Sequence, residues 1–341
     1  MRVIVTGGAG FIGGHVARAL HARGDVVTVV DDLSSGKREN IADGIRFVEM
    51  DIRSLSLAAR FADVKPDAVL HFAAQVSVLA SLRDPEYDYS VNFLGGHNVL
   101  KAAVGIGARA FVNVSTGIVY GEPDSDVEFP LVETTYKKIP FPYSQTKFAF
   151  ELMLAGSVSK RAISAATLRP GNVYGPRQDP HGEAGVVAIF SQRLIAGEPL
   201  VIHGEGSAVR DYVYVDDVVN AALLALDGLM TNPEALIPGT GNPPEPGSDS
   251  HSLDDIAFNI GTGVGTNVIA IADALTARAR DRGIAPRPRE YSAPRAREVP
   301  RIELCSDKAR RMLDWSPRTP LSDGLARTFD WFLDENTRLQ R

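Results

Sequence analysis

Apolar and polar residues follow one another along the first half of the chain in a regular succession of short and long stretches. Short apolar runs are typical of buried strands, and longer stretches with apolar residues at helical spacing are typical of amphipathic helices. The predicted strands cover residues 2–6, 26–30, 45–49, 68–72 and 110–115. Predicted helices begin at Phe11, near residue 55 and near residue 84, the last extending to residue 104. This order predicts an α/β fold with a doubly wound parallel sheet.

The second half of the chain is less regular and predicts a smaller, mixed α/β lobe. Its predicted helices and strands cover residues 186–196, 200–203, 210–214, 215–226, 307–313 and 323–336. We expect a first domain over residues 1–169 and a second over 170–341, with parts of 210–262 packed back on the first. Ser306 and Ser322 precede the last two helices and are predicted N-caps.

A glycine-rich loop follows the first predicted strand directly. Gly7, Gly10 and Gly13 form a GxxGxxG pattern, in which glycines allow a tight turn and close approach of the backbone to a pyrophosphate. The second predicted strand ends in Asp31, where a carboxylate can accept hydrogen bonds from an adenosine ribose. Asp31 and Asp32 would repel a 2′-phosphate. The pattern therefore predicts a Rossmann domain that binds NAD rather than NADP.

Other polar residues stand at the carboxyl ends of the predicted strands. Asp51, the segment His71-Phe-Ala-Ala74 and the pair Ser115-Thr116 each follow a strand. Ligands of doubly wound sheets bind beyond these ends, so the residues are predicted to converge on one site. Residues 121–142 contain four prolines and are predicted to form a loop that brings Tyr143 to the start of a helix.

Tyr143 and Lys147 form a Tyr-x-x-x-Lys pair. On a helix the two side chains lie one turn apart on the same face, so they can address one bound molecule. The spacing alone is common and equally fits an exposed pair of helical residues. Together with the nucleotide-binding loop upstream, it predicts redox chemistry on a hydroxyl group.

Composition narrows the class of protein. The chain has 341 residues, 44% of them hydrophobic and 23% charged, as in a globular protein large enough for two lobes. A formal net charge of −6 with interspersed signs argues against a nucleic-acid partner. The sequence shows neither a membrane span nor a signal-peptide pattern, so we expect a cytoplasmic protein without a membrane partner. With Cys305 as the single cysteine and no histidine cluster, neither a disulfide nor a metal site is expected.

With these motifs in place, the chain resembles the extended short-chain dehydrogenase/reductase family, the NAD-dependent epimerases and dehydratases, and within it the UDP-glucose 4-epimerases. The resemblance spans nearly the whole length. In the first half it rests on Thr6-Gly-Gly-Ala-Gly-Phe-Ile-Gly13, Asp31-Asp-Leu-Ser-Ser-Gly36, Asp51-Ile52, His71-Phe-Ala-Ala74, Asn92, Ser115-Thr-Gly-Ile-Val-Tyr-Gly121 and Tyr143-Ser-Gln-Thr-Lys147. In the second half it rests on Leu168-Arg-Pro-Gly-Asn-Val-Tyr-Gly-Pro-Arg-Gln-Asp-Pro-His181, Arg210-Asp-Tyr-Val-Tyr-Val-Asp216, Asn259-Ile-Gly-Thr-Gly263 and residues 295–299.

The resemblance implies a reversible oxidation at carbon 4 of a UDP-sugar, which interconverts UDP-glucose and UDP-galactose. A tightly held NAD would take a hydride from the sugar and return it to the opposite face. Tyr143 would be the base, and Thr116 would hydrogen-bond the reacting oxygen. Lys147 and the positive nicotinamide would favour the phenolate, so the pKa of Tyr143 is expected below its usual value of about 10.

The resemblance also implies which residues contact each ligand. The expected NAD-binding residues are Gly7, Gly10, Phe11, Ile12, Gly13, Asp31, Asp32, Leu33, Ser35, Gly36, Asp51, Ile52, Phe72, Ala73, Ala74, Asn92, Tyr143, Lys147 and Pro170. The expected substrate-binding residues are Thr116, Tyr143, Asn172, Val201, His203, Arg210, Arg295 and Glu298. The two arginines suit a diphosphate and the glutamate a ribose, although Arg210 could instead form a surface ion pair with Asp211.

Several alternatives stay open. Ile302 stands where some family members place a bulky tyrosine near the sugar, which would leave room for an N-acetyl group. The sugar (gluco, N-acetyl or uronic) and the nucleotide (UDP or dTDP) are therefore not decided. A 4,6-dehydratase or a decarboxylase shares the cofactor, but Gly117 and Ile118 stand where these enzymes carry acids, and neither can move a proton. A non-catalytic NAD-binding module would have no chemical need for the three predicted catalytic side chains together.

The same resemblance implies an oligomeric state. The amphipathic helices near residues 92–104 and 143–160 could pair across a two-fold axis, or pack within one chain. We expect a homodimer. Residues 238–252 are rich in proline, glycine and serine, which predicts a mobile surface loop.

Overall fold

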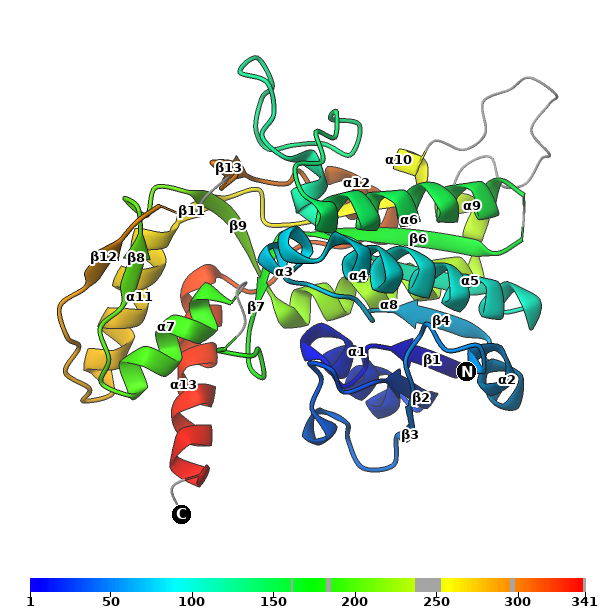
Figure 1. Ribbon diagram of the computed structural model, residues 1–341, viewed down its shortest axis with the longest axis horizontal. Coiled ribbons are helices and arrows are strands. Elements are labelled where there is room, and N and C mark those ends of the chain that lie inside the picture. The colour runs from blue at the N-terminus through cyan, green and yellow to red at the C-terminus, as the bar shows by residue number, and fades with distance from the viewer. Residues whose placement is uncertain (161, 182–184, 237–252, 295–297, 340–341) are drawn as a thin grey trace.

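The computed structural model describes residues 1–160, 162–181, 185–236, 253–294 and 298–339. The predicted loop at residues 238–252 and the predicted substrate residue Arg295 lie outside the described residues. Figure 1 shows a central sheet flanked by helices, with a smaller lobe beside it.

A parallel sheet forms the centre of the larger lobe. Its strands are β1 (Arg2–Thr6), β2 (Val26–Asp31), β3 (Arg46–Glu49), β4 (Ala68–His71), β5 (Ala110–Val114), β6 (Ser164–Pro170) and β10 (Ala257–Ile260). The seven strands lie in the order β10-β6-β5-β4-β1-β2-β3. All residues of β4, β5 and β10 are buried, because helices cover both faces of the sheet. The predicted doubly wound parallel fold is confirmed.

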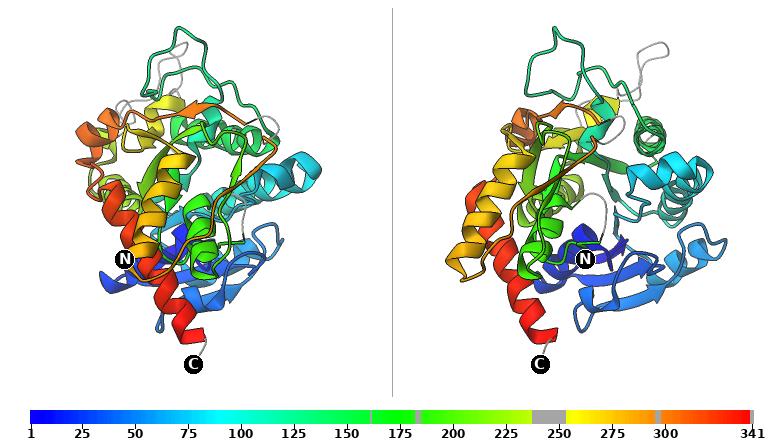
Figure 2. Two further views of the ribbon diagram at one scale, coloured as in Figure 1. Left: turned by 90° about the vertical axis from the view of Figure 1, so that its left-hand side faces the viewer. Right: turned by 60° about the vertical axis from the view of Figure 1, so that its left-hand side comes forward.

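Helices cover both faces of this sheet. They are α1 (Phe11–Ala22), α2 (Leu57–Val64), α3 (Val78–Arg83), α4 (Pro85–Tyr89), α5 (Gly96–Gly105), α6 (Pro142–Ser159), α8 (Val215–Thr231), α9 (Pro233–Leu236), α10 (Leu253–Ile256), α12 (Asp307–Leu313) and the short 3₁₀ turns η1 (Arg38–Asn40) and η3 (Gly117–Tyr120). α1 and α8 pack together on one face, and α2, α5 and α6 lie on the other (Figures 1 and 2). α1 buries Val16, Ala17 and Leu20, the positions that share one side of the helix.

The continuous helix expected near residues 84–104 is interrupted. A π-helical segment, η2 (Ser90–Gly95), separates α4 from α5. Asn92 lies in η2 with its side chain buried. π segments shift the helical face by an extra residue and are frequent at functional sites. The spacing of apolar residues does not reveal such a local change in hydrogen bonding, so the helix was predicted as one piece.

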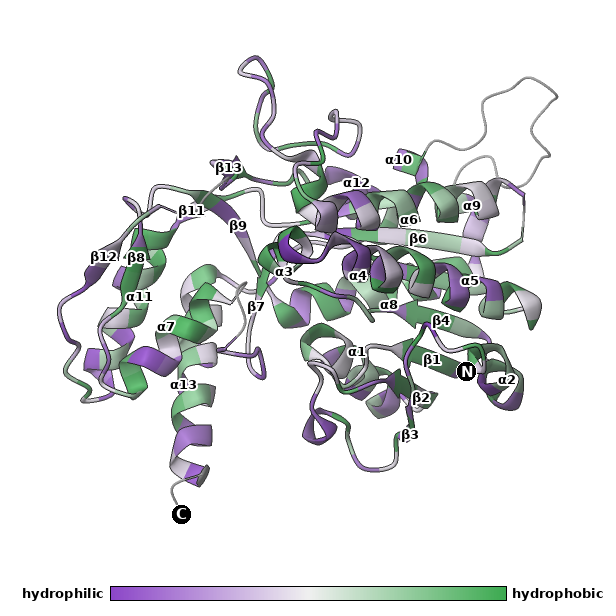
Figure 3. Cartoon of the chain, in the orientation of Figure 1, coloured by the Kyte–Doolittle hydropathy of each residue, from purple (hydrophilic) through white to green (hydrophobic). Residues whose placement is uncertain are grey.

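The smaller lobe has its own core. Its elements are β7 (Asn172–Tyr174), α7 (Val186–Ile195), β8 (Val201–His203), β9 (Val209–Tyr214), β11 (Gly265–Asn267), α11 (Val268–Asp281), β12 (Glu290–Ser292), β13 (Arg301–Ile302) and α13 (Leu321–Leu339). β9 pairs with β7, β11 and β13, whereas β8 pairs with β12. α7, α11 and α13 pack on one another around Phe190, Leu275 and Phe329, and Figure 3 shows apolar residues on all three helices.

The second half of the chain contributes to both lobes. β10 joins the edge of the large sheet beside β6, and α8 packs against α1 and the sheet. The boundary expected between residues 169 and 170 stays a prediction. None of the helices in the described ranges is long and apolar enough to cross a membrane.

The two predicted helix caps are not formed as expected. α13 begins at Leu321, so Ser322 lies inside its first turn. Ser306 does precede α12, but its hydroxyl accepts from the backbone nitrogen of Gly261 at 3.0 Å and donates to the carbonyl oxygen of Gly261 at 2.9 Å. Ser306 thus holds the N-cap position of α12, but its hydroxyl is directed to Gly261 and forms no side-chain cap hydrogen bond.

Candidate active site

The glycine-rich loop lies between β1 and α1 and leaves no room for side chains. Gly7 has φ +69°, and a Cβ there would lie 2.4 Å from the backbone nitrogen of Ala73. A Cβ on Gly13 would lie 2.2 Å from the carbonyl oxygen of Gly7. α1 begins at Phe11 with Gly10 as N-cap, without a side-chain cap and without an acidic residue in its first turn. Its first backbone amides can therefore meet a diphosphate, which fits a dinucleotide at this helix end.

Asp31 ends β2 and faces the glycine loop. Its carboxylate is 7% exposed and accepts hydrogen bonds from the backbone amides of Ala9 and Leu33, both at 2.9 Å. Burial raises the pKa of this carboxyl, and the two hydrogen bonds oppose that rise. Asp32 is exposed. The structure thus places the acid of β2 against the loop, as a ribose site requires.

The neighbouring predicted cofactor residues surround this acid. A Cβ on Gly36 would lie 2.9 Å from Oδ1 of Asp31, so the backbone passes very close to the carboxylate. Ser35 is exposed, and Phe11 and Ile12 are half-buried in the first turn of α1. These residues come together at the carboxyl ends of β1 and β2.

Asp51 and Ile52 lie beyond β3. The Asp51 carboxylate lies 2.5 Å from the guanidinium of Arg53, which lowers the pKa of Asp51. Ile52 is buried and packs under η2, where a Cβ on Gly95 would lie 2.7 Å from its Cδ1 atom. Asp51 therefore already has a cationic partner within its own turn.

The end of β4 joins the same edge of the sheet. His71 is buried, and its Nδ1 atom shares a hydrogen bond of 2.7 Å with the hydroxyl of Thr6. Burial lowers the pKa of His71 to about 3, so the ring is neutral at ordinary pH. Residues 72–74 then lead to Gln75, whose backbone nitrogen donates to the Asn92 side chain at 2.8 Å while Asn92 donates to its carbonyl oxygen at 3.0 Å.

The predicted catalytic side chains meet beyond β5. α6 begins with a proline, which favours the first helical position, and Tyr143 follows in the first turn. Thr116 lies two residues beyond the end of β5, and a hydrogen bond from its side chain lowers the pKa of the Tyr143 phenol. Lys147 lies one turn further along α6 and is 5% exposed. Pro170 ends β6 close by, since a Cβ on Gly117 would lie 3.2 Å from its carbonyl oxygen.

Burial is the largest cause of the pKa shifts of Tyr143 and Lys147. Desolvation raises the pKa of Tyr143 to about 12, opposed by the hydrogen bond from Thr116 and reinforced by the charge of Asp88. Desolvation lowers the pKa of Lys147 to about 8, opposed by the charges of Glu151 and Asp88. The expected lowering of the Tyr143 pKa includes the charge of a bound nicotinamide and stays a prediction; among the protein's own groups, burial outweighs the neighbouring donor.

In the smaller lobe, Arg210 lies on β9 and Asn172 on β7. The guanidinium of Arg210 lies 3.6 Å from the carboxylate of Glu298, which joins two of the predicted substrate residues. Asp211 is buried and accepts hydrogen bonds from residues 262–263 and from Leu304. It is thus a structural carboxylate, and the surface ion pair considered between Arg210 and Asp211 is wrong.

Val201 and His203 lie on β8, which does not pair with β9. Their strand pairs with β12, and the ring of His203 shares a hydrogen bond of 2.8 Å with the Ser292 hydroxyl. The structure gives these two predicted substrate residues partners of their own within the two-stranded sheet.

Three further polar residues lie in this region, and sequence reasoning predicted one of them. Ser115, predicted to converge on the site together with Thr116, directly follows β5, and its buried hydroxyl has no hydrogen-bond partner within the described residues. Its place at a strand end was a usable signal. Asp88 and Arg169 are also fully buried next to the predicted catalytic helix. No local motif marks them, because their partners are distant in sequence.

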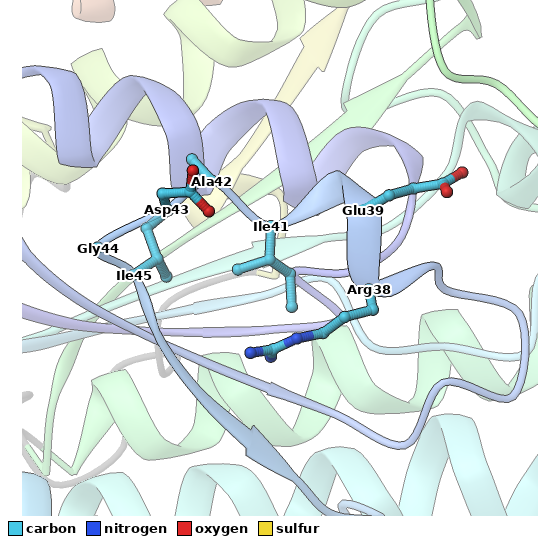
Figure 4. A pocket seen from close by; sticks show the side chains of 7 residues that line it. All are labelled: Arg38, Glu39, Ile41, Ala42, Asp43, Gly44 and Ile45. Atoms are coloured by element: carbon cyan, nitrogen blue, oxygen red, sulfur yellow. The ribbon is translucent and has the colours of Figure 1, made fainter.

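A hollow at the edge of the sheet lies apart from these residues. It is lined by residues 38, 39 and 41–45, and Figure 4 shows Arg38, Glu39 and Ile41 around it. None of the predicted site residues lines it. Within the described ranges, no group of histidine, cysteine, aspartate or glutamate side chains could hold a metal ion.

Comparisons with known proteins agree with this geometry. Residues 3–236 match the model of the family described as "NAD dependent epimerase/dehydratase family". A UDP-glucose 4-epimerase of Mycolicibacterium smegmatis is 38% identical over 98% of this chain and 100% of its own length.

Two solved structures extend the likeness to three dimensions. A UDP-glucose 4-epimerase of Thermotoga maritima, crystallised with UDP-glucose, has a TM-score of 0.86 and 39% identity over 98% of this chain and 100% of that chain. A UDP-glucose 4-epimerase of Thermus thermophilus in complex with NAD has a TM-score of 0.82 and 38% identity over 97% and 99% of the two chains.

Proposed function

The chain belongs to the NAD dependent epimerase/dehydratase family, and on this premise we propose that it interconverts UDP-glucose and UDP-galactose by inverting carbon 4 of the sugar. The observation that carries the proposal is the contact between Thr116 and Tyr143, with the buried Lys147 one turn further along the same helix. The chain that carries these residues is 38% identical to the UDP-glucose 4-epimerase of Mycolicibacterium smegmatis and 39% identical to that of Thermotoga maritima.

The residues at the carboxyl edge of the sheet fit NAD. The closely packed glycines and the open start of α1 suit the diphosphate, and Asp31 suits the adenosine ribose. Tyr143, Lys147 and Pro170 would lie at the nicotinamide end. Asp31 and its exposed neighbour Asp32 disfavour a 2′-phosphate.

The proton transfer belongs to Tyr143. Bound NAD supplies the hydride acceptor and donor and, when oxidised, a positive charge that favours the Tyr143 phenolate. Tyr143 would take the proton of the 4-hydroxyl and return it after the 4-keto sugar has turned over. Thr116 would hold the reacting oxygen by a hydrogen bond, and Lys147 would stabilise the phenolate.

The smaller lobe would anchor the nucleotide while the sugar turns. Arg210 would bind the diphosphate and Glu298 the uridine ribose, and the 3.6 Å between the two side chains supports contacts of both with one nucleotide. Asn172, Val201, His203 and Arg295 are proposed as further contacts. A fixed nucleotide lets the same catalytic residues reach both faces of carbon 4.

Activity on UDP-sugars tests this proposal. We expect purified protein incubated with UDP-galactose to form UDP-glucose without net consumption of NAD. A parallel incubation with UDP-N-acetylgalactosamine and UDP-glucuronate measures the preference among sugars. A stable 4-keto-6-deoxy product would contradict epimerisation and would point to the dehydratase branch of the family.

We further propose a homodimer in the cytoplasm. Exposed apolar side chains gather on α3, α4, η2 and α6, namely Leu79, Leu82, Tyr89, Leu94 and Leu152. Pairing of this face with a second copy would remove these side chains from water. We expect light scattering to give twice the mass of the chain. Leu152→Glu, at a side chain that is 50% exposed, is expected to give the monomer, and an unchanged mass would place the interface elsewhere.

A further inference from the structure

Asp88 is a fully buried carboxylate on α4 that the proposed reaction does not yet use. One of its oxygens accepts hydrogen bonds from the side-chain amides of Gln75 at 2.6 Å and Asn92 at 3.1 Å. The other accepts from the hydroxyl of Thr146 at 2.5 Å. A buried carboxylate is costly unless its lone pairs are satisfied, and here three neutral donors satisfy them.

The three donors come from three separate parts of the site. Gln75 follows residues 72–74, which lead from β4, and Asn92 lies in η2. Thr146 lies on α6 between Tyr143 and Lys147. Asp88 therefore connects the turn after β4, the π-helical segment and the predicted catalytic helix through one side chain.

Asp88 is also one of two anions that act on Lys147. The groups that interact with this ammonium are Glu151 from α6, Asp88 from α4 and the neutral ring of His71 from β4. Glu151 and Asp88 both favour the charged form of Lys147, against the effect of burial.

Glu151 and Asp88 differ in whether a neighbouring cation balances their negative charge. The carboxylate of Glu151 lies 2.6 Å from the guanidinium of Arg169, and both side chains are fully buried. Asp88 forms no ion pair with a lysine or arginine of the described residues, and its donors are neutral. The negative charge of Asp88 is thus the less compensated of the two near Lys147.

We propose that Asp88 is a positioning residue of the active site, which holds Thr146 and Asn92 in place and supplies the counter-charge that keeps Lys147 protonated. Its relevance to turnover rests on the proposed epimerase function. Its effect on Lys147 is a property of the protein itself and can be measured separately.

The carboxylate can be neutralised with little change in shape. Asp88→Asn keeps an acceptor and removes the charge, whereas Thr146→Val removes one donor and keeps the charge. Asp88 raises the pKa of both Lys147 and Tyr143, so its loss lowers both. Each limb of the pH dependence of kcat reports the titration of one of these two groups. Both limbs of the pH dependence of kcat on UDP-galactose should therefore move to lower pH in Asp88→Asn, by about one unit.

A direct titration accompanies the kinetics. In protein labelled with ¹³C at lysine Cε, the Lys147 resonance is identified by its loss in Lys147→Met. We expect its midpoint to fall in Asp88→Asn and to stay in place in Thr146→Val. A structural role alone would lower kcat in both variants and leave the limbs and the midpoint unmoved.

The outcomes separate the two proposals. An unchanged Lys147 midpoint in Asp88→Asn, or an equal shift in Thr146→Val, overturns the role of Asp88 as counter-charge. If the unaltered protein does not convert UDP-galactose, the proposed function fails, and the titration still decides the role of Asp88.

Discussion

Replacing Tyr143 by phenylalanine is expected to abolish epimerisation while bound NAD is retained. The change removes one hydroxyl from the first turn of α6, and Lys147 and the glycine loop stay in place. That hydroxyl is the group that would exchange a proton with the sugar, and it is held by Thr116. A positioned general base contributes about 10²–10⁴-fold to a rate, so we expect a loss of kcat in this range.

The matched control is Tyr136→Phe, which makes the same chemical change at a side chain that is 77% exposed. It should keep the activity of the unaltered protein. Cofactor content, measured by absorbance after release from the protein, should be equal in both variants. Activity of Tyr143→Phe within a factor of about two of the control would remove the phenol from the mechanism.

Replacing Arg169 by methionine is expected to produce the largest loss of stability. Arg169 and Glu151 are both fully buried, and their closest nitrogen and oxygen lie 2.6 Å apart. Arg169 also donates to the Tyr120 hydroxyl at 3.0 Å and to the Glu133 carbonyl oxygen at 3.2 Å. Removing one partner of a buried pair leaves an uncompensated charge and costs about 3–5 kcal/mol.

Arg310→Met is the control for this substitution, because Arg310 and Asp307 form an ion pair with both side chains 58% exposed. Such a surface pair contributes at most about 1 kcal/mol. Thermal unfolding of both variants measures the difference. The double variant Arg169→Met with Glu151→Gln should unfold at a higher temperature than Arg169→Met alone, because Glu151 then leaves no unpaired charge in the interior. Equal unfolding temperatures for Arg169→Met and Arg310→Met would contradict this account.

Sequence reasoning succeeded where the determinants are local. The glycine loop, the acid at the end of β2 and the spacing of Tyr143 and Lys147 all lie within short segments, so their types and order predict their geometry. The alternation of apolar runs predicted the sheet for the same reason. The cofactor and family followed from these segments together.

The remaining parts of the site depend on contacts between distant segments. Asp88 meets Thr146 across 58 positions, and the Tyr120 hydroxyl donates to Asn259 across 139 positions. No spacing rule connects such residues. The effect of burial on the pKa of Tyr143 is not readable from the sequence either, because burial is a property of the folded chain and depends on every element that covers the phenol.

The chain passes repeatedly between its two lobes. β9 of the smaller lobe continues directly into α8 on the large sheet, and β10 at the edge of that sheet leads on to β11 of the smaller lobe. Neither lobe is therefore a contiguous module that could be excised or exchanged by one cut. A protein engineer who wished to graft a different sugar specificity onto this nucleotide-binding core would have to transplant several separate stretches and preserve every crossing between them.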